Sequence, residues 1–214
     1  MTALPDTDTL TRTGAPASGS GRVLVIACGA LAREIVALRT LNGWSRLDLH
    51  CLPAILHNHP DRIPAAVAEA VARHTPDYDR ICVAYGDCGT GGRLAALCRE
   101  WGVEMIDAPH CYAAFEGAGT AAARADEIDA FYLTDFLVRQ FDAFVRRPLG
   151  LDRHPELRDI YFGNYTRLIY LAQTDDPALD AAARNQAATL GLAYARRLTG
   201  YGDLTGWLRR AAAP

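Results

Sequence analysis

The sequence predicts an α/β fold built around a parallel sheet. Short apolar runs rich in β-branched residues alternate with stretches of helical periodicity, and glycine or proline stands at most of the boundaries between them. A continuous apolar run suits a strand that is buried on both faces, and a helix between two such strands is the connection that parallel strands require. We therefore expect Rossmann-like βαβ units that form a parallel sheet of four strands or slightly more, followed by a helical C-terminal half.

The predicted elements begin at residue 22, where RVLVIA is the first apolar run; RICVAY is a later one of the same kind. Gly43 stands at the end of the first helix, Pro76 follows the second, and Gly102 ends the third. Glycine and proline commonly stand where a helix stops. The strands are expected at 22–27, 47–52, 80–85 and 103–107, and the helices at 31–41, 60–74 and 93–101.

The ends of the chain differ from this α/β domain, which is expected to span residues 22–117. Residues 1–21 are rich in Thr, Gly, Ser, Pro and Ala without periodicity, which predicts a disordered leader. Residues 118–214 show helical periodicity, and these helices are expected to pack on the α/β domain or to form the subunit interface of a homo-oligomer. The helical patterns cover 128–147, 155–173, 177–199 and 203–210.

The composition excludes several kinds of chemistry. All 22 basic residues are arginine, so the chain offers no lysine for a Schiff base, a P-loop or a general base. A net charge of −3 argues against a nucleic-acid partner, which requires clustered positive charge. No apolar run approaches the roughly 20 residues of a membrane span, and residues 1–22 lack the apolar segment of a secretory signal. We therefore expect a cytoplasmic protein with reduced cysteines.

Three cysteines follow directly after predicted strands. Cys28 comes after the first strand, Cys88 lies in the GDCGTGG loop after the third, and Cys111 lies in the PHCY segment after the fourth. The carboxyl ends of parallel strands meet at one edge of a sheet, which is where such folds bind ligands. Thiolates select iron–sulfur clusters or zinc over hard cations, and an open coordination position makes such a site reactive. The sequence thus predicts a metal centre held by these three cysteines, with an iron–sulfur cluster as the first choice and zinc as the second.

Burial is the competing explanation for each cysteine, because a free thiol often behaves as a small hydrophobic side chain. We assign this structural role to Cys82, inside a predicted strand, and to Cys98, on a predicted helix. Cys51 remains open between the two explanations.

Polar residues in the same loops complete the candidate site. His57 and His110 are candidate proton carriers or fourth ligands, and Asp87 is a candidate acid, base or supporting group. Asp87 can equally be a turn residue whose carboxylate accepts hydrogen bonds from backbone amides. Small residues whose backbone amides can approach a cofactor closely are expected at Gly29, Gly89, Thr90 and Gly91.

Better-known motifs are missing or incomplete. The first strand is followed by CGALA, which lacks the three glycines of a dinucleotide-binding loop. The segment GDCGT is similar to a nucleophile elbow, but its second glycine follows Cys88 directly rather than two residues later. No HExxH occurs.

Four segments together resemble a known family. ACGALAREI (27–35), LHNHP (56–60), YGDCGTGG (85–92) and PHCY (109–112) look like the family catalogued as domain of unknown function 1638. The resemblance implies no established reaction. It implies a corrinoid or methyltransferase protein as a partner, because the family's members accompany corrinoid-dependent methyl-transfer systems. The HxC zinc signature of corrinoid methyltransferases is absent, since Cys111 directly follows His110.

These observations leave three functional hypotheses. The first is a metal-binding protein that acts on a small anionic substrate through Cys28, Cys88 and Cys111, with a link to one-carbon metabolism. The second is a metal-free enzyme of the racemase type, in which two cysteines act as acid and base. The third is a non-enzymatic accessory protein of a methyltransferase system.

Overall fold

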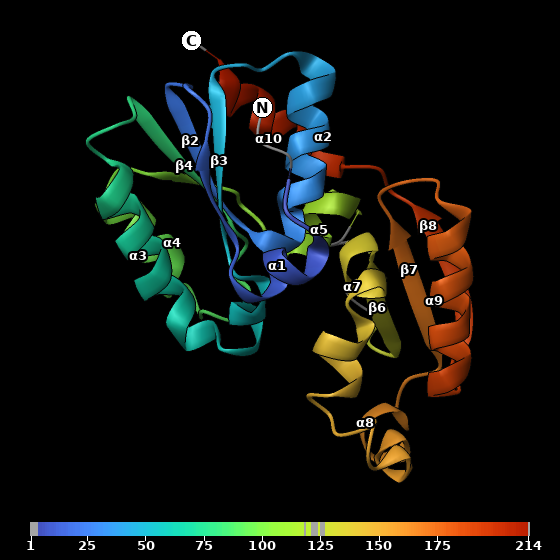
Figure 1. The fold of residues 1–214 in the computed structure, drawn as a ribbon. Helices are drawn as coiled ribbons and strands as arrows, with labels where there is room; N and C mark the ends of the chain where they lie inside the picture. The colour runs from blue at the N-terminus through green and yellow to red at the C-terminus, as the bar shows by residue number, and fades with distance from the viewer. Residues whose placement is uncertain (1–3, 118, 121–123, 125–126, 214) are drawn as a thin grey trace. The chain divides into compact units, whose positions relative to one another are not determined.

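The computed structural model describes residues 4–117, 119–120, 124 and 127–213 and contains two compact units. Unit 1 comprises the chain up to Ala114 together with the C-terminal segment from Gly202, and unit 2 comprises Phe115–Tyr201. Each unit contains a sheet of its own, as the ribbon in Figure 1 shows. Among the described residues, no helix is both long enough and apolar enough to cross a membrane.

The sheet of unit 1 has five strands in the order β1-β3-β2-β4-β5. Strands β2 to β5 are parallel, and β1 pairs antiparallel with β3. The predicted parallel sheet and its helices are therefore confirmed, with an additional edge strand. The strands are β1 (Ala15–Ser18), β2 (Val23–Cys28), β3 (Leu47–Leu52), β4 (Arg80–Ala84) and β5 (Glu104–Met105). The helices are α1 (Thr7–Arg12), α2 (Ala32–Asn42), α3 (Ile63–His74), α4 (Arg93–Glu100), α5 (Cys111–Glu116), which runs into unit 2, and α10 (Gly202–Ala212).

The strand order reverses at β2, which has β3 on one side and β4 on the other. Helix α2 covers one face of the sheet, while α3 and α4 pack together on the opposite face (Figure 1). This arrangement buries β2 completely from Val23 to Cys28, which explains its continuous apolar sequence. Open α/β sheets bind ligands at the carboxyl ends of the strands on either side of such a reversal. The reversal between β2 and β4 thus positions the candidate site.

The N-terminal segment corrects the prediction of a disordered leader over residues 1–21. Residues 7–18 form α1 and β1 instead. The Asp6 carboxylate accepts a hydrogen bond from the Thr9 amide at 2.8 Å and begins the helix, and Leu10 is fully buried. Strand β1 binds the free edge of β3, with Ala15 opposite Cys51. The order of this segment comes from a distant strand edge, which its Gly-, Ser- and Pro-rich composition does not reveal.

Unit 2 corrects the prediction that the C-terminal half is purely helical. It contains a three-stranded parallel sheet in the order β6-β7-β8. The predicted helical patterns at 128–147, 155–173 and 177–199 each contain a strand as well as a helical segment. Only the last pattern, 203–210, lies wholly within a helix, α10. The strands are β6 (Ala130–Thr134), β7 (Arg167–Ala172) and β8 (Ala193–Leu198), and the helices are α7 (Asp135–Arg139), α8 (Arg158–Phe162) and α9 (Pro177–Leu190).

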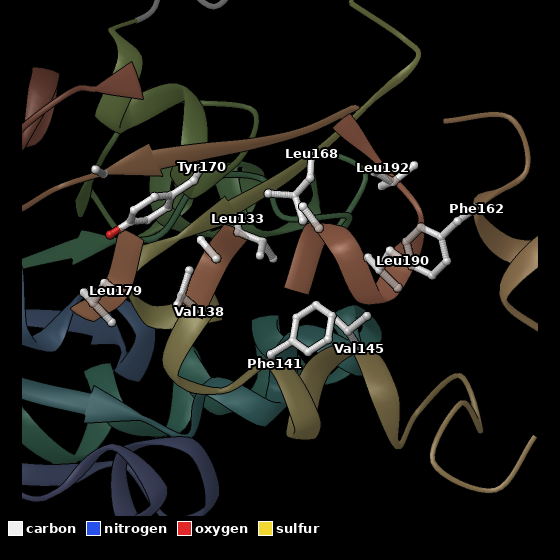
Figure 2. Close-up of a cluster of buried hydrophobic side chains, with 13 residues drawn as sticks. Leu133, Val138, Phe141, Val145, Phe162, Leu168, Tyr170, Leu179, Leu190 and Leu192 are labelled. Carbon is white, nitrogen blue, oxygen red and sulfur yellow. The ribbon is translucent and has the colours of Figure 1, made fainter. Parts of the chain in front are cut away.

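The core of unit 2 lies between its sheet and its helices (Figure 2). Leu168 and Tyr170 extend from β7 and are fully buried. Ala183 and Ala187 of α9 are also fully buried, and their small side chains allow that helix to approach closely. A π-helical turn at Asp142–Arg146 follows α7.

Candidate functional site

The candidate site lies at the carboxyl edge of the unit 1 sheet, at the reversal of strand order. Cys28 is the last residue of β2, and the loop that contains Cys88 follows β4. The parallel register pairs Cys28 with Leu52 and Ala27 with Ala84, so these strands end at the same edge. His57 lies in the short 3-10 helix Ala54–Asn58, which follows β3. Three side chains that are distant in the sequence therefore come from neighbouring strand ends.

Cys28 is a buried, protonated thiol. Its side chain is only 3% exposed, and burial raises the pKa of the thiol to about 12. Hydrogen bonds with the Ala30 backbone and the Tyr85 hydroxyl oppose this shift, while the nearby charge of Cys88 adds to it. The Cys88 sulfur therefore lies close enough to Cys28 to affect the pKa of its thiol. At neutral pH Cys28 can donate a proton but is not itself a thiolate.

Cys88 occupies a strained turn. Its φ angle is +47°, and among the described residues it is the one non-glycine residue with a positive φ. This left-handed conformation costs about 1–2 kcal/mol for a residue that has a Cβ atom. Strain of this kind is concentrated at functional sites, and the nucleophile elbow is one example. The structure therefore supplies the backbone feature that the incomplete GDCGT motif only suggests.

Contacts with the segment after β5 hold this turn in place. The amides of Asp87 and Cys88 donate to the carbonyl oxygens of Ala108 and Pro109 at 2.9 and 3.0 Å. At Gly86, a Cβ atom would lie 2.8 Å from the Ala108 oxygen, so only glycine allows this approach. Two chain segments thus position Cys88 together.

His57 is the partner of Cys88. The hydrogen bond between their side chains raises the pKa of the His57 imidazole, burial lowers it, and the charge of the Cys88 sulfur raises it further. His57 is an exposed residue, whereas Cys88 is 7% exposed. An imidazolium that contacts a cysteine favours its thiolate form, which is the nucleophilic and basic form of the residue. The arrangement is a cysteine–histidine pair with a neutral thiol beside it.

Asp87 organises the loop. Its carboxylate accepts hydrogen bonds from the Thr90 hydroxyl at 2.7 Å and from the amides of Gly91 and Gly92 at 3.1 and 2.6 Å. The bond from Thr90, followed by those from the amides, lowers the pKa of the Asp87 carboxyl group. These contacts match the turn role that the sequence left open, and the amide of Gly91 is engaged by Asp87. Gly89 and Gly91 both adopt positive φ angles that suit such a turn.

Gly29 has a structural explanation. A Cβ atom at this position would lie 2.3 Å from the backbone oxygen of Leu10, because the end of α1 passes directly over it. Glycine is therefore required here by the close approach of two backbones.

His110 and Cys111 stand at the start of α5. The Nδ1 atom of His110 accepts a hydrogen bond from the Ala113 amide at 3.2 Å, which caps this helix. Cys111 is the first residue of α5, and its side chain lies outside the described part of the structure. The predicted convergence of three cysteines therefore stays a prediction. Among the described side chains, no three His, Cys, Asp or Glu residues form a metal-binding group.

Of the other three cysteines, two lie in the core and one lies near the candidate site. Cys82 and Cys98 are buried in the core, as predicted. Cys51 lies near Cys28 and Glu34, and burial, followed by these two neighbours, raises the pKa of its thiol. Sequence reasoning missed Glu34, which is only 5% exposed in the first turn of α2. The sequence indicates Glu34 only as an acidic residue in the helix that follows the buried strand β2.

Comparison with known protein families gives one match, over residues 51–208 of the 214-residue chain. The matched range includes His57 and Cys88, whereas Cys28 and the ACGALAREI segment precede it. No curated protein and no solved structure matches the chain. The matched family is described as protein of unknown function (DUF1638), and the chain belongs to it.

Proposed function

We propose that this protein is an enzyme that transfers a proton at a carbon atom of a small anionic substrate, with Cys88 as the base and Cys28 as the acid. The observation that carries the proposal is the left-handed turn that places Cys88 against His57, beside a buried thiol that stays protonated. A protonated thiol beside a cysteine–histidine pair offers both the proton donor and the base that a paired acid–base catalyst requires.

The reaction follows from these two protonation states. The Cys88 thiolate removes a proton from the carbon next to the substrate's carboxylate, so a C–H bond breaks and an S–H bond forms. The electron pair moves into the carboxylate as an enolate. Cys28 then donates its proton to the opposite face of that carbon and becomes a thiolate. The product is the mirror-image form at that carbon, and solvent exchange restores both cysteines.

His57 supports this chemistry in two ways. Its imidazolium stabilises the Cys88 thiolate before the reaction. Because His57 is an exposed residue, the same positive charge attracts the substrate's carboxylate toward the site. An anionic substrate fits this edge for that reason.

Deuterium exchange tests the proposal on several classes of acid at once. The protein is incubated in D2O with a panel of amino acids and 2-hydroxy acids, and loss of the α-proton signal is followed by NMR. We expect exchange for at least one class of acid, and a loss of at least about 100-fold in Cys88→Ser and in Cys28→Ser. Cys98→Ser, which alters a core thiol on α4, is the matched control and should retain the activity. Exchange that survives Cys88→Ser, or its absence across the panel, contradicts the proposal.

A metal centre is the second candidate, and one contact favours it. The Asp87–Cys88 turn is bonded to Ala108 and Pro109, which lead directly into Cys111. The thiolates of Cys28, Cys88 and Cys111 together with the His57 imidazole have the donor chemistry that zinc or an iron–sulfur cluster requires. Within the described structure this set is incomplete, so the proposal depends on Cys111. A bound metal would supply Lewis-acid or redox chemistry.

Anaerobic purification followed by elemental analysis and an absorption spectrum distinguishes the two candidates. A metal centre predicts iron with sulfide, or zinc, at a near-stoichiometric amount, which Cys111→Ser removes and Cys98→Ser does not. Metal content that is unaffected by Cys111→Ser contradicts this candidate. Deuterium exchange by protein that contains no metal supports the cysteine pair.

A further inference from the structure

A second cavity, within unit 2, has no part in the thiol chemistry. It has a volume of about 700 Å3 and lies between the segment from α7 to the π-helical turn, α8 and α9. Ligand pockets occupy roughly 300–1,000 Å3, so a metabolite of ordinary size fits. The cavity is open to solvent on one side, and all its lining residues belong to unit 2.

Three arginines line this cavity, and each forms an ion pair with a carboxylate. Arg139, Arg146 and Arg158 line it together with a single carboxylate, that of Asp142. Arg146 pairs with Asp142 at 2.8 Å, Arg139 lies 3.9 Å from the Asp176 carboxylate, and Arg158 donates to the Asp159 carboxylate at 2.8 Å. These groups are partly exposed, and ion pairs at a surface contribute little, so a more highly charged anion can replace them. Several guanidinium groups around one opening suit the oxygen atoms of a phosphate.

The wall of the cavity contains a buried acceptor without a partner. The amide nitrogen of Gln186 donates to the Val138 backbone oxygen at 2.9 Å, which fixes the orientation of the side chain. Its Oε1 atom is buried, and no donor among the described residues reaches it. Because Oε1 is inaccessible to solvent, a ligand in the open cavity does not reach it, and Gln186 instead joins α9 to α7 in this wall.

The floor of the cavity is apolar. Val138, Phe141 and Leu190 line it and also belong to the core of unit 2, where Figure 2 shows them. The adjoining wall includes residues of the π-helical turn Asp142–Arg146. Single π-helical turns of this kind are frequent at functional sites.

From these features we infer that unit 2 binds a phosphate monoester whose organic part is apolar or aromatic. The guanidinium groups of Arg139, Arg146 and Arg158 take the phosphate, and the organic part lies over Val138 and Phe141. This site is separate from the cysteine pair, so its occupation does not depend on the proposed reaction.

Calorimetric titration of the full chain tests the inference with phenyl phosphate and adenosine 5′-monophosphate as probes. Phenol, adenosine and inorganic phosphate serve as the counterparts that lack the charge or the ring. We expect at least one monoester to bind with a stoichiometry of one, at least about 10-fold more tightly than its uncharged counterpart or inorganic phosphate.

Variants assign the binding to this cavity. Arg146→Gln combined with Arg158→Gln should weaken binding by at least about 10-fold, whereas Arg153→Gln, an exposed arginine outside the cavity, should leave it unchanged. Cys88→Ser should also bind normally, which separates this result from the fate of the proposed reaction. The inference is overturned if neither monoester binds more tightly than inorganic phosphate, or if the double variant binds as the parent does.

Discussion

His50 makes the stability of unit 1 depend on pH in a way that the structure quantifies. Its side chain lies on β3, is 8% exposed, and its Nδ1 atom is 3.1 Å from Nε2 of His74. Burial, followed by the charges of His74 and Arg73, lowers the pKa of His50 from 6.5 to about 4. The unfolded chain therefore takes up a proton at His50 well before the folded unit does.

The sign and size of the effect follow from proton linkage. The contribution of His50 is fully present above about pH 6.5 and is lost as the pH falls toward about 4, because the unfolded state binds more protons in this window. At about 1.4 kcal/mol for each pKa unit, the loss is about 3 kcal/mol in the free energy of unfolding. Carboxyl groups also titrate near the lower end of this window, so the comparison must be made with a variant.

The assay is urea unfolding of the full chain at several pH values, with hydrogen exchange in β2 and β3 as the report on unit 1. We expect His50→Gln to show a flatter pH dependence than the parent protein between neutral pH and about 4.5. His154→Gln, which removes an exposed histidine of unit 2, should leave the profile of unit 1 unchanged. Parallel profiles for His50→Gln and the parent protein would refute the reasoning.

Three further predictions concern the turn and unit 2. Cys88→Gly should be more stable than Cys88→Ala by about 1 kcal/mol, because glycine adopts a φ of +47° without strain; equal unfolding free energies would contradict this. Gly86→Ala should destabilise unit 1 by about 1–3 kcal/mol and slow the alkylation of Cys88. The new Cβ atom at position 86 would lie 2.8 Å from the Ala108 oxygen, so the loop would have to shift. Unchanged stability and an unchanged alkylation rate would contradict this prediction. Asp135→Asn should destabilise unit 2 by about 2–4 kcal/mol in urea unfolding. The buried carboxylate of Asp135 accepts a hydrogen bond from the Tyr170 hydroxyl at 2.6 Å and others from backbone amides. A loss below about 1 kcal/mol would contradict the importance of this network.

The centre of the unit 1 sheet was predictable because β2 and β3 are buried on both faces. β2 is buried at every position, and its continuous apolar sequence stands out between helical patterns; β3 is also buried throughout, although Asp48 and His50 interrupt its apolar residues. The edge strand β1 gives no such pattern, since its hydrogen-bond partners lie on β3, which is distant in the sequence.

Two of the three strands of unit 2 lack a clear strand pattern, whereas β7, with the apolar sequence RLIYLA, has one and was wrongly included in the helical pattern 155–173. β6 passes into α7 at Thr134 and Asp135 without a glycine or proline between them, so strand and helix read as one apolar segment. β8 has no fully buried residue and carries two arginines, which removes the apolar run that marks a strand in a parallel sheet.

The location of the candidate site was predictable, but its chemistry was only partly so. The positions of Cys28 and Cys88 after strands indicate a shared edge, because parallel strands end together. The left-handed conformation of Cys88 depends on the segment at 108–109, and its contact with His57 depends on the path of the loop after β3. Neither follows from local sequence.

The central claim, that His57 holds Cys88 as a thiolate, can be measured directly by alkylation with iodoacetamide and mass spectrometry of each cysteine. A free cysteine is only about 1% thiolate near pH 6.5, so its alkylation slows steeply as the pH falls. We predict that Cys88 of the parent protein reacts at a nearly constant rate from about pH 8 to about pH 6, and that His57→Gln slows it at least about 10-fold at the lower pH. A Cys88 profile that falls with pH like that of a free cysteine, unchanged by His57→Gln, would contradict the account.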